Sequence, residues 1–200
     1  MSRLMEKIRS QSRLLLLMIP LGIAAAVALN QLVAVLPLMK WFPRYSESVK
    51  PVMYRYSLIQ GLVLYGIVTP VIEEALFRWI LFGRLKVYVS AVAAGVLSAI
   101  IFGIYHGNFI QGIYAFIFGL MLAFVYWRTD LVLASVIMHG AANSFIYASA
   151  FIPALGILND DPWRVISMVI CFMITGIMIY RLAVKVRGKS IEPKRPIFPR

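Results

Sequence analysis

The sequence predicts an all-α protein, a polytopic transmembrane bundle of about six helices. Of its 200 residues, 62% are hydrophobic and only 14% are charged, and the mean hydropathy is +0.85. Soluble domains carry about 25% charged residues. Several apolar runs also approach or exceed the roughly 20 residues that an α-helix needs to cross about 30 Å of hydrocarbon. Composition and run length together favour a helical membrane protein.

Charge distribution and cysteine content exclude other kinds of protein. The net charge is +12, but the basic residues gather at the two ends and in short connections, as topology signals do. They form no nucleic-acid footprint, so we expect no nucleic-acid partner. The single cysteine, Cys171, rules out a disulfide framework and a cysteine-based metal cluster.

The first region, residues 1–57, is predicted to hold one membrane helix. A basic start over 1–13 precedes an apolar run over 14–39, a pattern that also fits a cleaved signal peptide. The run is longer than the core of a signal peptide, about 7–15 residues, which favours a membrane helix. Residues 40–57 mix basic, aromatic and proline residues, as an interfacial loop does.

The second region, residues 58–152, is predicted to be the functional core. Its expected membrane helices cover 58–82, 87–105, 109–127 and 131–152, with a short basic turn at 83–86. The third region, 153–200, is expected to contain a loop over 153–162, a last membrane helix over 163–184 and a basic tail.

An even number of spans places both ends of the chain on one side of the membrane. Fourteen basic residues then fall on the side of the termini and five on the other, with Arg78 inside the membrane. Cytoplasmic connections carry the excess of lysine and arginine. We therefore expect an integral protein of a bacterial plasma membrane with both termini in the cytoplasm.

Three charged residues interrupt the apolar run over 58–82: Glu73, Glu74 and Arg78. A charge at the bilayer centre costs about 2.5–3.5 kcal/mol even on the mildest insertion scales. Such a cluster persists only if its members pair, face a polar cavity or take part in chemistry. The cluster is therefore a functional-site hypothesis by default.

The two histidines of the chain also lie in or at the ends of predicted spans. His139 is followed four residues later by Asn143, which places both side chains on one helix face. Each polar group would be an expensive orphan in hydrocarbon, so convergence on one site is expected. At about 1.5 Å per residue, Glu73 and His139 lie near mid-membrane, but His106 lies ~30 Å from Lys86, at the far interface. Either the third helix is strongly tilted, or the site lies in the outer half of the membrane.

Such a set of side chains supports the activation of water. A buried glutamate can take a proton from water and return it to a leaving amine. A neighbouring histidine can share that water or ligate a metal ion that acidifies it. A second histidine with an amide one turn away can donate hydrogen bonds to a developing oxyanion. Arg78 can pair with Glu74 and orient it, which leaves Glu73 as the more available base.

These residues fall into three ordered motifs on successive predicted helices. The motifs are Glu73-Glu74-x-x-x-Arg78, Phe102-x-x-x-His106 and His139-x-x-x-Asn143. Together they resemble the signature motifs of the CPBP family. This family comprises CAAX proteases and bacteriocin-processing intramembrane proteases, is also called the Abi family, and is typified by the Rce1-like prenyl-protein endopeptidases. The resemblance covers about residues 58–150.

The resemblance implies hydrolysis of a peptide bond within the membrane. The roles that it implies are water activation by Glu73 and His106, an oxyanion hole from His139 and Asn143, and support from Glu74 and Arg78. The family is often described as metalloproteases. A divalent metal, zinc, is the cofactor that the resemblance allows, with Glu73, His106 and His139 as its ligands.

The sequence thus favours a membrane endopeptidase that acts on a peptide or protein substrate at the bilayer. A leader peptide, a bacteriocin precursor and a fragment of a membrane protein are the substrates considered. The alternative is a non-catalytic membrane scaffold, or a bacteriocin self-immunity protein, that keeps the protease fold. An ion or proton pathway is less favoured, because the polar groups form one cluster and not a chain across the membrane.

Overall fold

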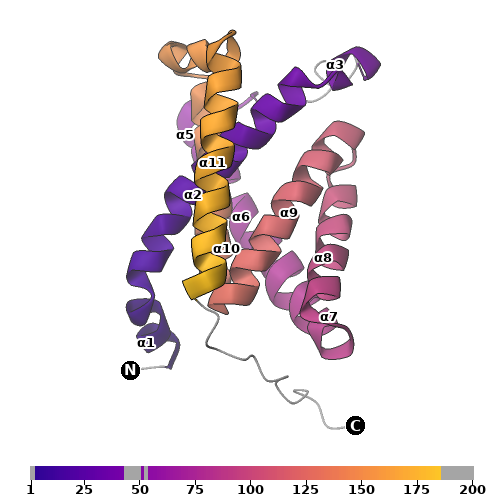
Figure 1. Ribbon diagram of the computed structural model, residues 1–200, viewed down its shortest axis with the longest axis vertical. Helices are drawn as coiled ribbons and strands as arrows, with labels where there is room; N and C mark the ends of the chain where they lie inside the picture. The colour runs from indigo at the N-terminus through magenta and orange to yellow at the C-terminus, as the bar shows by residue number, and fades with distance from the viewer. Residues whose placement is uncertain (1–2, 43–50, 52–53, 186–200) are drawn as a thin grey trace.

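The computed structural model describes residues 3–42, 51 and 54–185, and every regular element in these ranges is helical (Figure 1). The elements outside the long helix described below are α1 (Arg3–Ser10), α2 (Ser12–Val35), α3 (Leu38–Trp41), α8 (Ala91–Tyr105), α9 (Phe109–Thr129), α10 (Val132–Ser149), a 3-10 segment η3 (Pro153–Asn159) and α11 (Trp163–Lys185). The basic tail expected after residue 185 and most of the interfacial loop lie outside the described residues.

One continuous helix carries the charged cluster, and its geometry changes along its length. It consists of α5 (Leu58–Val63), the π-helix η1 (Leu64–Val68), α6 (Thr69–Glu74), the π-helix η2 (Ala75–Phe82) and α7 (Gly83–Tyr88). It is called helix 58–88 below. Stretches of π-helix are rare, and they occur frequently at functional sites.

The predicted fold class is confirmed. Among the described residues, five helices are long and apolar enough to cross a membrane: α2, helix 58–88, α9, α10 and α11. The sixth apolar helix, α8, has only 15 residues. By length and composition, these described helices agree with the bundle of about six helices that the sequence predicts.

The prediction of a basic turn at 83–86 is wrong. The chain stays helical through α7 and turns only at Val89, whose backbone is extended (φ −131°, ψ 170°). Ser90 then caps α8 by accepting a hydrogen bond from the backbone N–H of Ala93 at 3.2 Å. Basic residues were interpreted as a loop signal, but they are good helix formers and are favourable in the last turn of a helix.

The first membrane helix is shorter than expected. The apolar run continues to residue 39, but α2 ends at Val35 and the next residue, Leu36, is extended (φ −70°, ψ 148°). The cause is Pro37, because a proline disfavours the helical conformation of the residue before it.

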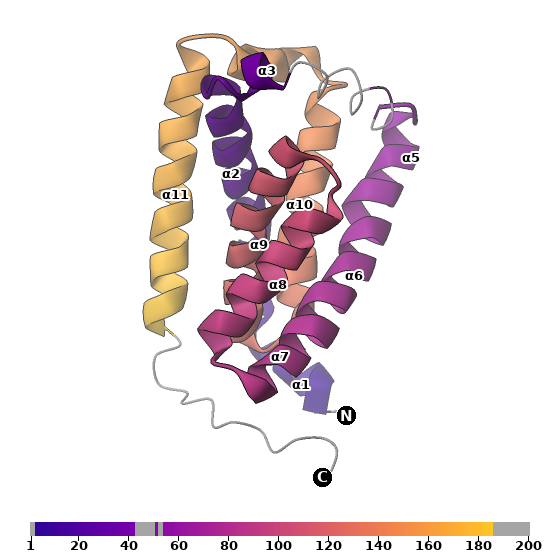
Figure 2. The same ribbon diagram turned by 90° about the vertical axis from the view of Figure 1, so that its right-hand side faces the viewer.

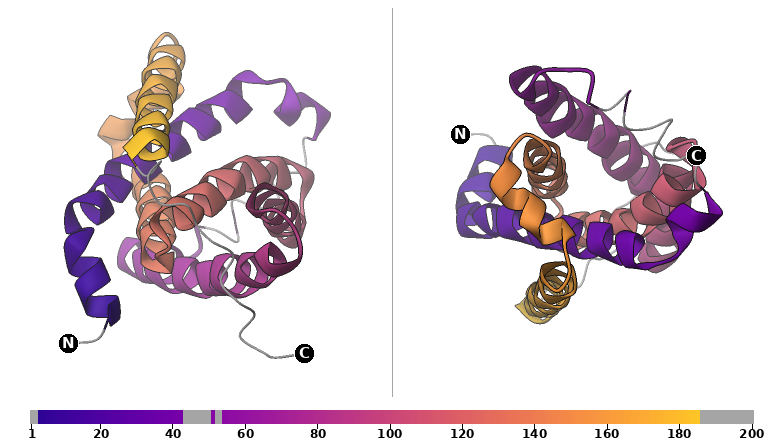
Figure 3. Two further views of the ribbon diagram at one scale, coloured as in Figure 1. Left: turned by 60° about the horizontal axis from the view of Figure 1, so that its bottom comes forward. Right: turned by 90° about the horizontal axis from the view of Figure 1, so that it is seen from above.

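The bundle packs around α10. Its neighbours include α2, η1 and α9, while α8 pairs with α9, and α11 lies on the outside against α2 (Figures 2 and 3). Small residues allow the close approach, as is usual between membrane helices. A Cβ atom on Gly22 of α2 would lie 2.1 Å from the Met138 carbonyl oxygen of α10, and one on Gly140 would lie 2.6 Å from the Gly66 carbonyl oxygen of η1.

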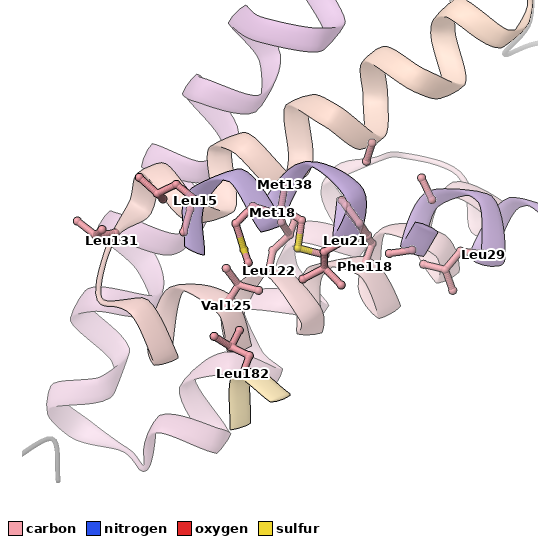
Figure 4. Close-up of a cluster of buried hydrophobic side chains, with 14 residues drawn as sticks. Leu15, Met18, Leu21, Leu29, Phe118, Leu122, Val125, Leu131, Met138 and Leu182 are labelled. Carbon is pink, nitrogen blue, oxygen red and sulfur yellow. The ribbon is translucent and has the colours of Figure 1, made fainter. Parts of the chain in front are cut away.

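The largest apolar cluster lies between α2, α9 and α10 (Figure 4). Leu21, Leu122 and Met138 are each 0% exposed. In a bilayer the lipid tails are as apolar as these side chains, so tight van der Waals packing contributes more to helix association than the removal of water. This cluster fixes α10 against α2 and α9 and thereby the position of the polar residues that α10 carries.

The two ends of the bundle differ in charge. One end, called the basic end, holds α1, α7 and the end of α9 (Figures 1 and 2). Lys7 of α1 pairs with Asp130, which follows α9, at 2.7 Å. Arg128 donates a hydrogen bond to the Ala183 carbonyl, which joins the end of α9 to the end of α11. The other end, called the opposite end, holds α3, η3 and the start of α5.

Candidate functional site

Glu74 lies at the centre of the polar residues and joins two helices. Its Oε1 accepts a hydrogen bond from Arg78 Nη1 at 3.0 Å and one from His139 Nδ1 at 2.9 Å. Glu74 and Arg78 are both 0% exposed. Hydrogen bonds between charged partners are stronger than neutral ones, and a fully buried carboxylate requires them. One oxygen atom thus holds helix 58–88 and α10 together.

Arg78 extends this network to α8 and α9. Its second terminal nitrogen, Nη2, donates to the Gly119 carbonyl of α9 at 3.1 Å. Its guanidinium carbon lies 4.4 Å from the centre of the Phe102 ring on α8, a cation–π contact. A Cβ atom on Gly119 would lie 3.2 Å from Nη2, so the glycine provides the space for the arginine. The guanidinium fork therefore contacts three helices at once.

His139 lies between two carboxylates. Its Nδ1 donates to Glu74, and its Nε2 lies 3.7 Å from Glu73 Oε2. Because Glu74 accepts from Nδ1, Nε2 is the ring nitrogen that faces Glu73 and the remaining space of the site. Glu73 and His139 are 7% and 4% exposed.

His106 caps the C-terminus of α8 and is partly exposed. Its Nδ1 lies 2.9 Å from the Phe102 carbonyl oxygen. A carbonyl oxygen only accepts hydrogen bonds, so we assign the ring proton to Nδ1, and Nε2 then presents a lone pair. The Phe102 ring meets both imidazoles edge to face, with centroids 4.8 Å from His106 and 5.9 Å from His139. The Phe102 ring thus contacts both histidines and Arg78.

The distance of His106 from the basic end of its helix is shorter than the ~30 Å estimated from the sequence. That estimate started from Lys86, but the helix that carries His106 begins only at Ala91. His106 therefore lies about 22 Å along α8, and not ~30 Å from a turn at Lys86. The late turn at Val89 accounts for the difference.

Asn143 uses one of its two side-chain N–H groups to bind a backbone carbonyl of helix 58–88. Its Nδ2 donates to the Tyr65 carbonyl of η1 at 3.1 Å. The π-helix leaves this carbonyl without a helical donor, because the Thr69 N–H bonds to the Leu64 carbonyl instead. The next residue that could donate is Pro70, which has no N–H. The asparagine thus satisfies a carbonyl that the local sequence leaves free.

The structure therefore gathers Glu73, Glu74, Arg78 and His139 into one network, with His106 across the Phe102 ring and Asn143 one turn along α10. Sequence reasoning missed the bond between Glu74 and His139, and it missed Gly119 and Tyr65. A proline inside an apolar run, as at Pro70, is a signal of an unsatisfied carbonyl in the preceding turn. No comparable local signal marks Gly119.

The side chains of the site do not form a set of ligands for a metal ion among the described residues. Structural and catalytic zinc sites take at least three protein ligands with free lone pairs. Within residues 3–42, 51 and 54–185, no three His, Cys, Asp or Glu side chains form a group that could hold a metal. His139 directs both ring nitrogens at carboxylates. We therefore derive no chemical step through a metal, and the metal ligands suggested by the resemblance stay a prediction.

A buried constellation of carboxylates, imidazoles and an arginine in a bundle of apolar helices defines a membrane protein with an intramembrane polar site. Comparison with known proteins narrows this class. Residues 55–145 match the family described as type II CAAX prenyl endopeptidase Rce1-like. The chain is therefore similar to this family over the region that carries the polar site.

A curated relative is similar over a comparable part of the chain. The chain is 31% identical over 122 residues to the "Putative membrane peptidase YdiL" of Bacillus subtilis (strain 168). The aligned part is 59% of this chain and 49% of that protein, so the chain spans about half the length of this relative. No solved structure matches the chain significantly.

Proposed function

We propose that the protein is an intramembrane endopeptidase that hydrolyses a peptide bond of a membrane-associated peptide or protein with an activated water molecule. The observation that carries the proposal is the buried network in which Glu74 accepts hydrogen bonds from Arg78 and His139. Among the described side chains, the neighbouring Glu73 accepts no hydrogen bond and lies 3.7 Å from His139 Nε2. A carboxylate that lies near an imidazole and is not engaged in a structural hydrogen bond is available for proton transfer.

Glu73 and His106 are proposed to activate the water. Glu73 provides a carboxylate that can accept a proton from water and return it to the leaving amine. His106 presents Nε2, because Nδ1 is committed to the Phe102 carbonyl. A lone pair on Nε2 can accept a hydrogen bond from the same water and orient it. The partial exposure of His106 provides the path by which water reaches the site.

His139 and Asn143 are proposed to stabilise the oxyanion. Nδ1 of His139 is fixed by Glu74, so Nε2, when protonated, is the donor that faces the reacting carbonyl. Asn143 uses one N–H on the Tyr65 carbonyl and keeps a second one. Donors that are fixed before the reaction lower the barrier, and the loss of one costs about 10²–10³ in kcat.

Glu74 and Arg78 are proposed to support the site without contacting the substrate. Both are fully buried, and their bonds lock His139 in one tautomer. A neutral isostere at Glu74 would therefore disturb the orientation of His139 before it changed any contact with the substrate.

The substrate belongs to the proposal only as a class. We propose a peptide with an apolar segment that partitions into the bilayer, such as a leader peptide, a bacteriocin precursor or a fragment of a membrane protein. A bacterial plasma membrane is the proposed location.

The proposal is tested with Glu73→Gln and His106→Ala in purified full-length protein. Glutamine keeps the shape of Glu73 but cannot accept the proton, and removing a general base costs about 10²–10⁴ in rate. Glu6→Gln is the matched control, because Glu6 is exposed on α1 at the basic end. The assay follows cleavage of a panel of quenched fluorescent peptides with apolar segments, delivered in detergent micelles.

Full activity of both site variants would contradict the water-activation scheme. A different result points to the alternative function. If the wild type cleaves no peptide of the panel, while deletion of its gene has an effect that Glu73→Gln still complements, the scaffold or self-immunity function is favoured.

A further inference from the structure

The connection between α8 and α9 consists of three residues, His106, Gly107 and Asn108 (Figure 1). Gly107 has a left-handed backbone (φ +71°), which glycine adopts without strain. α8 ends immediately before this connection, and α9 begins immediately after it. The connection therefore sets where His106, a proposed catalytic residue, lies relative to both helices.

The end of α8 is tightened, and this leaves a carbonyl for the His106 ring. The backbone N–H of His106 bonds to the Gly103 carbonyl, three residues back, at 3.2 Å. The N–H of Gly107 bonds to the Ile104 carbonyl in the same way, at 3.1 Å. Such bonds are common in the last turn of a helix. The Phe102 carbonyl, four residues before His106, is then open to His106 Nδ1 at 2.9 Å. The orientation of the imidazole thus depends on the backbone geometry of the connection.

Asn108 caps α9 and is bonded at both ends of its carboxamide. Its Oδ1 accepts a hydrogen bond from the Gln111 backbone N–H at 2.8 Å, as an N-cap side chain does. The oxygen must face this donor, so the side-chain NH2 group points the other way. Nδ2 donates to Gln111 Oε1 and to the His106 carbonyl, the latter at 3.4 Å. One amide therefore joins the start of α9 to the residue that ends α8.

The first turn of α9 is a fixed anchor for this amide. Its Ile110 is 2% exposed. A Cβ atom on Gly103 of α8 would lie 2.8 Å from the Gly112 carbonyl oxygen, and one on Gly112 would lie 3.2 Å from the Gly103 carbonyl oxygen. Backbones in such close contact leave the two helices little room to shift. A side chain fixed to α9 can therefore hold a residue at the end of α8 in place.

From these contacts we infer that Asn108 is a positioning residue, which holds the His106 backbone in the geometry that keeps Nδ1 on the Phe102 carbonyl and the lone pair on Nε2. The inference rests on the proposed function for the part that His106 plays in catalysis, but not for the effect of Asn108 on the imidazole. Asn108 acts through His106 and not on the substrate. A serine in its place would keep the cap, since a hydroxyl can accept the Gln111 N–H, but it would lose the NH2 group.

The test compares Asn108→Ser with Asn108→Ala, which removes the cap as well. Ser90→Ala is the matched control, because Ser90 caps the other end of the same helix, α8. Tm, kcat and the nitrogen NMR signals of the histidine rings are measured on the purified full-length protein in detergent. The NMR spectra are recorded at about pH 8, where a histidine with the ordinary pKa is neutral. The chain has two histidines, so the signals of His106 are identified by their loss in His106→Ala.

We expect Asn108→Ser to keep Tm within about 2 °C of the wild type, because serine and asparagine are equally good caps. The His106 signals should change from one tautomer, protonated at Nδ1, to a mixture of two, while those of His139, which Glu74 holds, stay unchanged. kcat should fall about 10- to 100-fold, since a misplacement of about 1 Å can have this effect. Asn108→Ala should lose as much kcat and also lower Tm by about 1–8 °C, whereas Ser90→Ala should lower only Tm.

His106 signals in Asn108→Ser that match those of the wild type would overturn the inference, whatever the activity. A loss of kcat in Ser90→Ala as large as that in Asn108→Ala would also overturn it, because the effect would then belong to helix capping in general. Changed His106 signals with full kcat would support the positioning by Asn108 and contradict the catalytic part of His106 in the proposed function. The NMR measurement needs no substrate, so it tests the inference even if the wild type cleaves no peptide of the panel.

Discussion

The buried arginine provides the sharpest test of how this site is held together. Arg78 is 0% exposed, bonds to Glu74 and to the Gly119 carbonyl, and lies against the Phe102 ring. Arg78→Met keeps most of the volume but removes the charge and both hydrogen bonds. Breaking a buried pair by removing one partner costs about 3–5 kcal/mol, because the other charge stays buried.

That cost converts into a measurable change in melting temperature. For a chain of this length, 1 kcal/mol shifts Tm by about 2–4 °C, so Arg78→Met should lower Tm by about 6–20 °C. The assay is thermal unfolding of the purified protein in detergent, followed by the loss of the monodisperse peak in size-exclusion chromatography. Lys7→Met is the control, because the pair of Lys7 with Asp130 is partly exposed and such pairs contribute at most about 1 kcal/mol.

A second variant separates the buried charge from lost packing. In Glu74→Gln combined with Arg78→Met, no carboxylate is left unpaired beside the methionine, and replacing both members of a buried pair is often close to neutral. We therefore expect the double variant to regain at least half of the loss in Tm. An Arg78→Met protein as stable as the Lys7→Met control would refute the reasoning. So would a double variant less stable than the single one.

Two further predictions concern the close contact of α10 with helix 58–88. Gly140→Ala places a Cβ atom 2.6 Å from the Gly66 carbonyl oxygen, so it should lower the free energy of unfolding by about 1–3 kcal/mol. The control is Gly176→Ala, which should not destabilise the protein, because a Cβ atom there meets nothing within 4 Å. Equal Tm values for these two variants would contradict this packing. Pro70→Ala supplies a helical N–H that competes with Asn143 for its carbonyl, so kcat should fall while Tm holds or rises, since proline inside a helix is unfavourable. An unchanged kcat would show that the Asn143 contact does not matter.

The fold class and most helix positions could be predicted because their signals are local. Apolar runs and the scarcity of charge set the number of spans, and the charged residues within one run marked where to look for a site. Errors arose where two local signals compete. Basic residues at 83–86 indicate a loop and equally suit the last turn of a helix, and an apolar run does not end where Pro37 ends the helix.

The candidate site could be predicted only as a set of residues. The sequence pairs Glu74 with Arg78, since they are four apart on one helix. It cannot show that Glu74 also binds His139, which is 65 positions away, or that Arg78 reaches the Gly119 carbonyl of another helix. Nor does the sequence reveal the π-helices, since the register of backbone bonds responds to the packing of neighbouring helices.

By itself, then, the sequence determined that this is a helical membrane protein with costly polar groups that must meet. Its basic residues also predict that both termini face the cytoplasm. The tertiary structure decided which partner each polar group takes. The physical reason is that the cost of burying a charge depends on the residue, whereas the relief of that cost depends on atoms brought within about 3 Å by distant parts of the chain.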